Sequence, residues 1–114
     1  MISPELLKGS LKTIVLKVLE ENSRMYGYEI TKKVEDLTRG KIVLTYGALY
    51  PVLHKLEAEG VLVTEPENYN NRIRIYYMLT TKGKSVVREK LEELSEFIDT
   101  LKGIVDIQPG LSHA

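Results

Sequence analysis

Hydrophobic positions recur at helical spacing in three stretches of the first sixty residues. The first stripe steps by three and four residues and predicts a helix over about 5–21 or 10–21. A second helix is expected between 26 and 40 and a third between 45 and 60, each ending at a glycine. Because Pro51 in the third stretch cannot donate a backbone hydrogen bond, we expect a slight bend or an irregular first turn there.

After residue 60 the hydrophobic period changes from helical spacing to strict alternation. Val61–Glu65 alternates briefly, and Arg72–Leu79 alternates clearly, with aliphatic residues on one face and arginine and tyrosine on the other. The intervening Pro66–Asn71 is rich in asparagine, which favours turns. The two stretches therefore predict an antiparallel hairpin with a loop of about six residues.

The last stretch predicts one long amphipathic helix. It is capped by Thr80 or Thr81 and is expected to continue until Pro109 and Gly110 stop it. Its hydrophobic residues step alternately by four and three, the seam spacing of a coiled coil. The seam consists of Val87, Leu91, Leu94, Ile98, Leu101 and Val105.

This seam is longer than three short helices can cover, so a second copy of the same helix is its simplest partner. We therefore expect a homodimer. The first helix is expected to join the interface through Leu7, Leu11, Ile14 and Val15. The alternative is that the seam packs within its own domain, against the first helix.

Three short helices, a hairpin and one long helix is the element order of a winged helix-turn-helix domain. In that arrangement the second and third helices form the helix-turn-helix, the third enters the DNA major groove, and the hairpin is the wing. We expect a mainly α-helical chain with a small β-hairpin. The winged helix-turn-helix domain is placed at 1–80, a C-terminal dimerisation helix at 81–107 and a flexible tail at 108–114.

The net charge of zero conceals two segments of opposite sign. Residues 72–84 carry two arginines and two lysines and no acidic residue, whereas residues 85–114 carry three basic and six acidic residues. Electrostatic steering depends on the local field rather than on the sum of charges. The predicted wing is therefore a candidate surface for nucleic acid.

One face of the third helix lies away from its hydrophobic stripe and is a candidate for reading the major groove. Gly47 would let the DNA backbone approach closely, and the hydroxyls of Tyr46 and Tyr50 would reach phosphates or base edges. Lys55 lies on the same face. For Tyr50 the alternative is packing against the second helix. His54 is expected to be a solvated surface residue rather than a DNA contact, and no set of metal ligands accompanies it.

The predicted wing and the start of the second helix supply further candidates. Those of the wing are Asn70, Asn71, Arg72 and Arg74. Arginine there can pair with phosphates or enter the minor groove, although the alternative is an ordinary charged edge strand. Tyr26 and Tyr28 begin the second helix, whose backbone N–H groups suit a phosphate. The alternative is that one of these rings packs beneath the wing.

Four sequence blocks carry a resemblance to a known family. They are Tyr26-Gly27-Tyr28-Glu29-Ile30, Leu49-Tyr50-Pro51-Val52-Leu53, Leu56-Glu57-Ala58-Glu59-Gly60 and Arg74-Ile75-Tyr76-Tyr77-Met78-Leu79-Thr80. In this order and spacing they closely resemble the PadR-like family of bacterial transcription regulators. The similarity covers about residues 10–85, and the single C-terminal helix is similar to the smaller subgroup of that family.

The resemblance implies a homodimer with a winged helix-turn-helix at each end, in which the two C-terminal helices cross. It also implies repression through near-palindromic double-stranded DNA operators. Some small members stack flat aromatic effectors on a tryptophan of the last helix. This chain has no tryptophan, and Leu94 aligns near that place. That route is therefore not expected, and another small-molecule effector at the dimer interface stays open.

Composition narrows the remaining function classes. Without cysteine there is no disulfide scaffold, thiolate metal site or cysteine nucleophile. No apolar stretch approaches the length of about 20 residues that spans a bilayer, and the first residues lack the layout of a signal peptide, so we expect a cytoplasmic protein without membrane association. No nucleophile with a base, phosphate-cradling glycine loop or metal-ligand cluster supports an enzyme, and no cofactor or metal is expected.

Two functions from different classes remain. The first is a sequence-specific DNA-binding transcriptional regulator. The second is a winged-helix docking module that binds protein and never touches DNA. The basic run in the predicted wing favours the first, whereas an acidic wing would have favoured the second.

Overall fold

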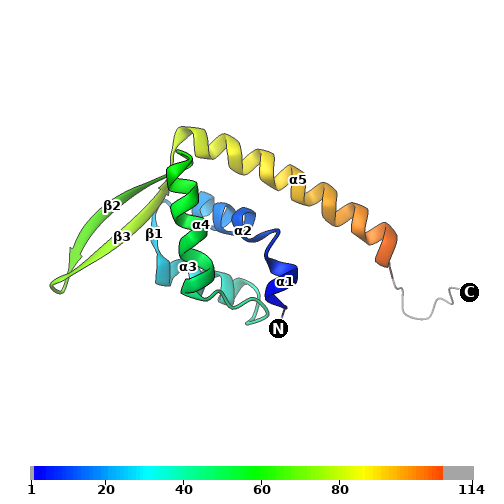
Figure 1. Cartoon of the computed structure of the whole chain (residues 1–114), viewed down its shortest axis with the longest axis horizontal. Coiled ribbons are helices and arrows are strands. Elements are labelled where there is room, and N and C mark those ends of the chain that lie inside the picture. Colours follow the sequence, from blue (N-terminus) through cyan, green and yellow to red (C-terminus); the bar gives the residue numbers. More distant parts are fainter. Residues whose placement is uncertain (1, 107–114) are drawn as a thin grey trace, which may run out of the picture.

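The computed structural model describes residues 2–106, and Figure 1 shows a small helical body from which a hairpin and a long helix project to opposite sides. The chain is mainly α-helical with a small antiparallel sheet, which confirms the predicted fold class. In order, the elements are α1 (Pro4–Leu7), α2 (Leu11–Glu21), β1 (Met25–Tyr26), α3 (Gly27–Leu37), α4 (Tyr46–Ala58), β2 (Leu62–Tyr69), β3 (Arg72–Leu79) and α5 (Thr81–Val105). The tail predicted over 108–114 lies outside the described residues.

The first predicted helix is two helices. α2 begins at Leu11, which confirms the later of the two predicted starts, and α1 is a separate turn opened by Pro4. Ser10 precedes α2 without capping it through its side chain. Its hydroxyl donates instead to the carbonyl of Leu7 at 3.2 Å and so closes α1.

The core lies where α2, α3 and α4 meet the first turns of α5. Its largest fully buried side chains are Val15, Leu16, Ile30, Val34, Leu49, Leu53, Leu56 and Val87. Burying such a side chain contributes about 1.5–3 kcal/mol. Since Leu49, Leu53 and Leu56 all lie on one side of α4, the opposite side of that helix is left to solvent.

Threonine caps begin both α4 and α5. Thr45 Oγ1 accepts a hydrogen bond from the N–H of Ala48 at 3.2 Å, as predicted. Thr80 Oγ1 accepts one from the N–H of Gly83 at 2.9 Å, so Thr80 and not Thr81 is the cap of α5. α4 is α-helical from Tyr46 onward and continues through Pro51, so its first turn is regular.

The sheet has three antiparallel strands in the order β1-β3-β2 rather than two. The added strand, β1, is only two residues long and pairs Met25 with Tyr77 and Tyr26 with Tyr76. A strand of two residues gives no alternation to detect, which explains why the sequence pattern did not predict it. β1 ties the start of α3 to the base of the hairpin.

The predicted six-residue hairpin loop is wrong. β2 continues to Tyr69, and the turn consists of Asn70 and Asn71, both at positive φ of 48° and 62°. Two left-handed residues match the right-handed twist of a hairpin, and asparagine tolerates that conformation better than most residues. Pro66 fits inside β2 because β2 is an edge strand, where a missing N–H is tolerated.

α5 divides the predicted seam into two parts. Val87 is fully buried in the core of its own chain, and Leu91 packs partly against it. Leu7, Leu11 and Val15 are buried there as well. These residues already fill the core of one chain and leave little surface for a partner. The intramolecular alternative therefore describes the first half of the seam and the start of α2.

An ion pair fixes α5 along α2. The Nε of Arg88 donates to Glu20 Oε2 at 3.1 Å, and its Nη2 also hydrogen bonds to the same carboxylate. These hydrogen bonds from Arg88 lower the pKa of Glu20 below its ordinary value. The direction of the projecting part of α5 is set by this contact and by Val87.

We expect Gly83→Ala to lower the free energy of unfolding by about 1–3 kcal/mol, because a β-carbon at this position would lie 2.2 Å from the backbone carbonyl oxygen of Val61. The matched control is Gly103→Ala in the same helix, where no atom lies within 4 Å of the added carbon. Alanine should stabilise that position by up to about 1 kcal/mol. Thermal unfolding of both variants checks this, and an equal shift in both would contradict it.

Candidate nucleic-acid interface

α3 and α4 form the helix-turn-helix. The turn between them leaves α3 through Arg39 and Gly40, whose φ angles of 53° and 76° are left-handed. Thr38 holds it together: its hydroxyl donates to the carbonyl of Val34 at 2.8 Å and accepts from the N–H of Ile42 at 3.0 Å. This turn places the exposed side of α4 next to the hairpin (Figure 1).

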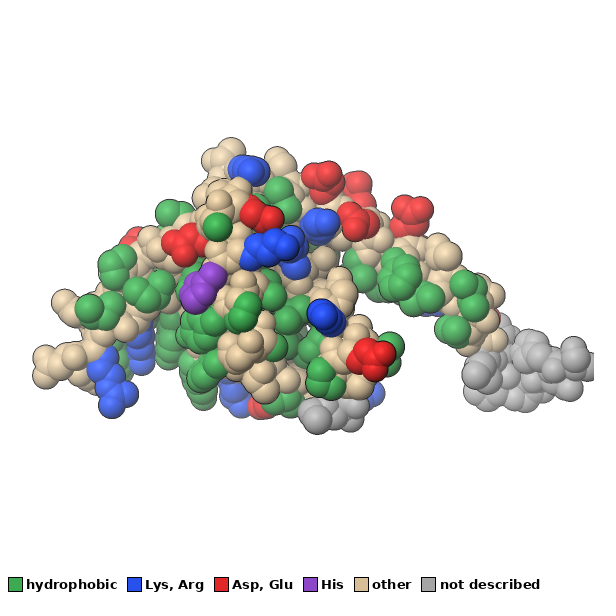
Figure 2. All heavy atoms as spheres, in the orientation of Figure 1, with side chains coloured by type: hydrophobic (Ala, Val, Ile, Leu, Met, Phe, Trp, Pro, Cys, Tyr) green, Lys and Arg blue, Asp and Glu red, His purple; other side chains and the backbone are tan. Residues whose placement is uncertain are grey.

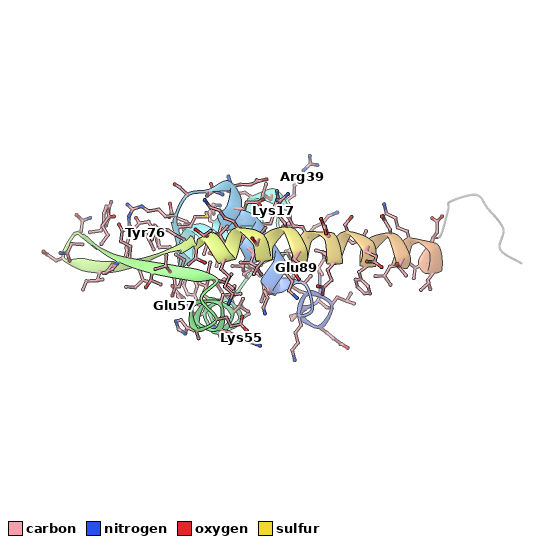
Figure 3. All side chains as sticks on the ribbon, turned by 90° about the horizontal axis from the view of Figure 1, so that it is seen from above. Lys17, Arg39, Lys55, Glu57, Tyr76 and Glu89 are labelled. Atoms are coloured by element: carbon pink, nitrogen blue, oxygen red, sulfur yellow. The ribbon has the colours of Figure 1, made fainter. Side chains whose placement is uncertain are left out.

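The exposed side of α4 carries a row of rings. Tyr46 is 51% exposed, its ring centroid lies 5.7 Å from that of Tyr50, and the Tyr50 ring lies 5.8 Å from His54. These three residues are four apart and therefore share one helix face. Lys55 is exposed beside them and lies on the outer side of α4 in Figure 3.

Tyr50 packs against the start of α3. Its hydroxyl occupies the space that a side chain on Gly27 would need, since a β-carbon there would lie 2.2 Å from the hydroxyl oxygen. Burial raises the pKa of Tyr50. Of the two roles considered for this tyrosine, packing is the one that its surroundings support.

Gly47 has no intramolecular reason to be glycine. It is helical rather than left-handed, and the only atom within 4 Å of an added β-carbon is Thr45 Oγ1 at 3.9 Å. Glycine weakens a helix relative to alanine. Gly47 borders a hollow of about 500 Å³ between the first turn of α4 and the segment around Leu7 and Leu11.

The start of α3 lies beneath the hairpin. The N–H of Tyr26 donates to Glu29 Oε1 at 3.2 Å, which is half of a capping box. The Tyr26 ring contacts Tyr76 of β3 edge to face at 5.5 Å, whereas Tyr28 is 53% exposed. Tyr26 thus takes the packing role, and Tyr28 is left accessible.

At the hairpin, Asn70, Asn71 and Arg72 are exposed at the tip. Arg74 is half-buried because its guanidinium lies over two rings, 4.4 Å from the Tyr26 centroid and 3.6 Å from that of Tyr69. Arg72 makes no ion pair among the residues that the structure describes. The structure therefore brings Arg72, Tyr28 and Tyr46 to the exposed surface of the wing, α3 and α4.

The hairpin is less basic than its second strand suggests. Glu65 and Glu67 of β2 lie on the same face as Arg74, because Glu67 pairs directly with Arg74 in the antiparallel register. Arg24 binds both carboxylates, with 3.0 Å from Nη1 to Glu65 Oε1 and 2.5 Å from Nη2 to Glu67 Oε2. The hydrogen bond to Glu67 raises the pKa of Arg24.

Arg24 is the residue at this site that sequence reasoning missed. Its partners lie 41 and 43 positions away in the chain, and only the strand pairing brings them to it. No local pattern around Arg24 distinguishes it from an ordinary surface arginine.

The projecting half of α5 presents an apolar surface. Figure 2 shows hydrophobic side chains along one side of it and acidic side chains along the other. The exposed apolar residues are Phe97, Ile98, Leu101, Ile104 and Val105. A hollow of about 410 Å³ lies between this helix and the start of α2, lined by Thr13, Leu94, Phe97 and Thr100 among others.

Within residues 2–106, no helix is long and apolar enough to cross a membrane. The same residues contain no group of three or more metal-ligating side chains placed to hold an ion.

The amino-acid sequence of this chain is similar to those of known proteins. Residues 15–89 match the Transcriptional regulator PadR-like family. A protein from Lysinibacillus sphaericus is 30% identical over 112 residues, which is 94% of either chain, and the transcriptional regulator Rv3488 of Mycobacterium tuberculosis is 35% identical over 69 residues, 60% of this chain and 64% of its own.

Solved structures agree with this match. A transcriptional regulator from Clostridium thermocellum superposes with a TM-score of 0.82 at 28% identity, over 92% of this chain and 99% of its own. A PadR family regulator from Eggerthella lenta gives 0.73 at 32% identity, over 89% and 82%. Members of this family regulate transcription and are not enzymes. The match over most of the domain, together with the winged helix-turn-helix geometry, shows that the chain belongs to the PadR-like family of transcriptional regulators.

Proposed function

We propose that this transcriptional regulator is a homodimeric repressor that binds a near-palindromic operator through α4 and the wing. The observation that carries the proposal is that Tyr28, Tyr46 and Arg72 are all exposed, one each on α3, α4 and the wing. Tyr46 and Gly47 would enter the major groove, and Arg72 with Asn70 and Asn71 would follow the phosphates beside it.

The packed residues keep supporting roles in this proposal. Arg74 stacks on rings, yet the edge of its guanidinium can still donate to a phosphate. Tyr26 and Tyr50 hold α3, α4 and the wing together. Lys55 would add positive charge on the exposed side of α4.

The dimer in this proposal is formed by the projecting half of α5. Phe97 is 58% exposed and Ile104 is 75% exposed, and hydrophobic residues of this size are costly to leave in water along a whole helix face. Leu94, Ile98, Leu101 and Val105 lie on the same helix, and Ile14 packs beside the core of α2. Two copies crossing here would set the operator half-sites about one helical turn, roughly 34–36 Å, apart.

A small-molecule effector fits this arrangement. The hollow beside Leu94 and Phe97 would be bordered by the dimer interface. A ligand there would change the angle between the two α5 helices and so the spacing of the wings, which is a rigid-body mode of regulation.

The docking-module alternative has one observation in its favour, the two carboxylates of β2. Arg24 pairs with both of them, however, and Arg72 stands at the tip without such a partner among residues 2–106. We therefore favour DNA over a protein partner.

We expect the wild-type protein to bind DNA from its own upstream region with an affinity that falls steeply with salt, and Arg72→Ala to weaken binding to all sequences. The slope of log affinity against log salt should fall by about one, because one phosphate contact is lost. A salt-titrated gel shift measures this. The control is Lys17→Ala, which removes the same charge from α2 on the α5 side (Figure 3). An equal change in the control would mean that Arg72 contributes only to the net charge of the protein and makes no phosphate contact of its own.

We expect Gly47→Ala to raise the free energy of unfolding by up to about 1 kcal/mol and yet to weaken operator binding. The added carbon meets no atom closer than 3.9 Å in the free protein, but it would stand between α4 and the DNA backbone. Thermal unfolding and gel shifts on one preparation measure both quantities. Unchanged affinity in the stabilised variant would remove Gly47 from the interface.

We expect Leu101→Asp to convert the dimer into folded monomers, because each interface would bury two unpaired carboxylates. Light scattering gives the mass, and circular dichroism confirms the fold. Leu37→Asp is the matched control, since Leu37 is 64% exposed at the end of α3, away from α5. A mass that stays unchanged in Leu101→Asp would exclude this part of α5 from the interface.

A further inference from the structure

The outer half of the wing has little backbone support. β1 pairs with β3 only at Tyr76 and Tyr77, so β3 from Arg72 to Ile75 has β2 as its one neighbour. A two-stranded hairpin is marginally stable in water by itself. Whatever holds the tip of the wing in place must therefore be side chains.

One face of the outer wing makes no such contact. In the antiparallel register, Ile73 and Ile75 share a face with Asn68 and Pro66. Ile73 is 69% exposed and Ile75 is 40% exposed, so this face does not pack on the helical body. Closer to the base, the same face is held by a hydrogen bond of 3.0 Å from Thr64 to Glu57 of α4.

The opposite face is anchored at one cross-strand pair. Glu67 and Arg74 lie directly opposite each other, and each is held by a residue of the segment between α2 and α3. Arg24 binds Glu67 at 2.5 Å, and the Tyr26 ring lies under Arg74 at 4.4 Å. Both strands are therefore tied to the body at the same level of the hairpin.

Arg24 joins these contacts into one stack. Its guanidinium lies 4.0 Å from the centroid of Tyr76, which contacts Tyr26, which in turn lies under Arg74. Arg74 continues the stack to Tyr69 near the tip. Figure 3 shows Tyr76 on one side of the hairpin and Glu57 on the other, so the stack occupies the face that α4 does not hold.

We propose that Arg24 is a positioning residue that fixes the angle of the wing relative to α3 and α4 through its ion pairs with Glu65 and Glu67, a contact called the Arg24 clamp below. The planar shape of the guanidinium group makes this arrangement possible. The proposal rests on the proposed DNA-binding function, because a fixed wing angle matters when α4 and the wing engage one duplex together. Arginine suits this role because its planar guanidinium stacks flat on a ring while its N–H groups, which lie in the same plane, bind two carboxylates, whereas the ammonium of lysine has no plane to stack.

The decisive variant is Glu65→Gln/Glu67→Gln. It removes two negative charges near the DNA, so electrostatics alone would raise operator affinity. If Arg24 positions the wing, operator affinity changes in the opposite direction. The variant loses the ion pairs with Arg24, so the wing is less firmly oriented and operator affinity falls roughly threefold to tenfold, as expected when a contact at the rim of an interface loses its preorganisation. Higher affinity in this variant overturns the proposal.

Three comparisons separate the ion pairs of Arg24 from a general effect of charge. Glu89→Gln/Glu92→Gln changes net charge by the same amount on α5 and should leave operator affinity within about twofold of the wild type. Arg24→Lys keeps the charge but should lose affinity as Arg24→Gln does, and wild-type affinity in the lysine variant overturns the proposal. Combining Arg24→Gln with the double variant should cost no more than Arg24→Gln alone, since one clamp is lost in each.

Hydrogen exchange of the free protein gives a readout that needs no DNA. Amides of the outer wing should exchange at least about threefold faster in Arg24→Gln and in Glu65→Gln/Glu67→Gln, while amides of α2 and α4 stay at wild-type rates. If amides of the outer wing exchange at wild-type rates in these variants, the proposal is overturned, whatever their operator affinity. A wild-type protein that fails to bind any DNA overturns the proposed function instead, and the two failures are thus distinguishable.

Discussion

The corner where α4, β2 and α5 meet sets the geometry of the whole protein. Thr80 lies at its centre: its hydroxyl donates to the carbonyl of Gly60 at 2.7 Å and accepts from the N–H of Gly83. The first turn of α5 approaches the carbonyl of Val61 so closely that a β-carbon on Gly83 would collide with it. α4 ends, the wing begins and α5 starts within this one contact. Their relative angles therefore depend on it.

The long helix serves two purposes because its environment changes along its length. Near the corner it completes the core through Val87, and Arg88 pins it to Glu20 of α2. Farther on, it borders only a hollow shared with the start of α2, and Ile104 near its end is left exposed. A hydrophobic seam of constant spacing is thus divided between intramolecular packing and a surface suited to a second copy.

Charge on the wing has to be considered as pairs of residues rather than as a segment. Arg24 comes from the stretch before β1 and pairs with Glu65 and Glu67, so these two carboxylates of β2 are not left unpaired. Arg72, at the turn, keeps its charge available. Exposed ion pairs of this kind add little stability. Their consequence is the local field and the direction in which the hairpin points.

The sequence by itself determined the elements that depend on local periodicity and capping: α3, α4, α5, the alternation of β3 and the Thr45 cap, and through their order the winged helix-turn-helix fold. Local signals suffice there because a helix face or a strand face repeats within a few residues. Only the tertiary structure decided the two-residue strand β1, the tight Asn70–Asn71 turn, the burial of Val87 and the pairing of Arg24 with carboxylates more than forty positions away. The strand β1, the burial of Val87 and the pairing of Arg24 depend on which distant segments meet, and the position of the turn depends on how far β2 stays paired with β3. Hydrophobic spacing along a single chain records neither.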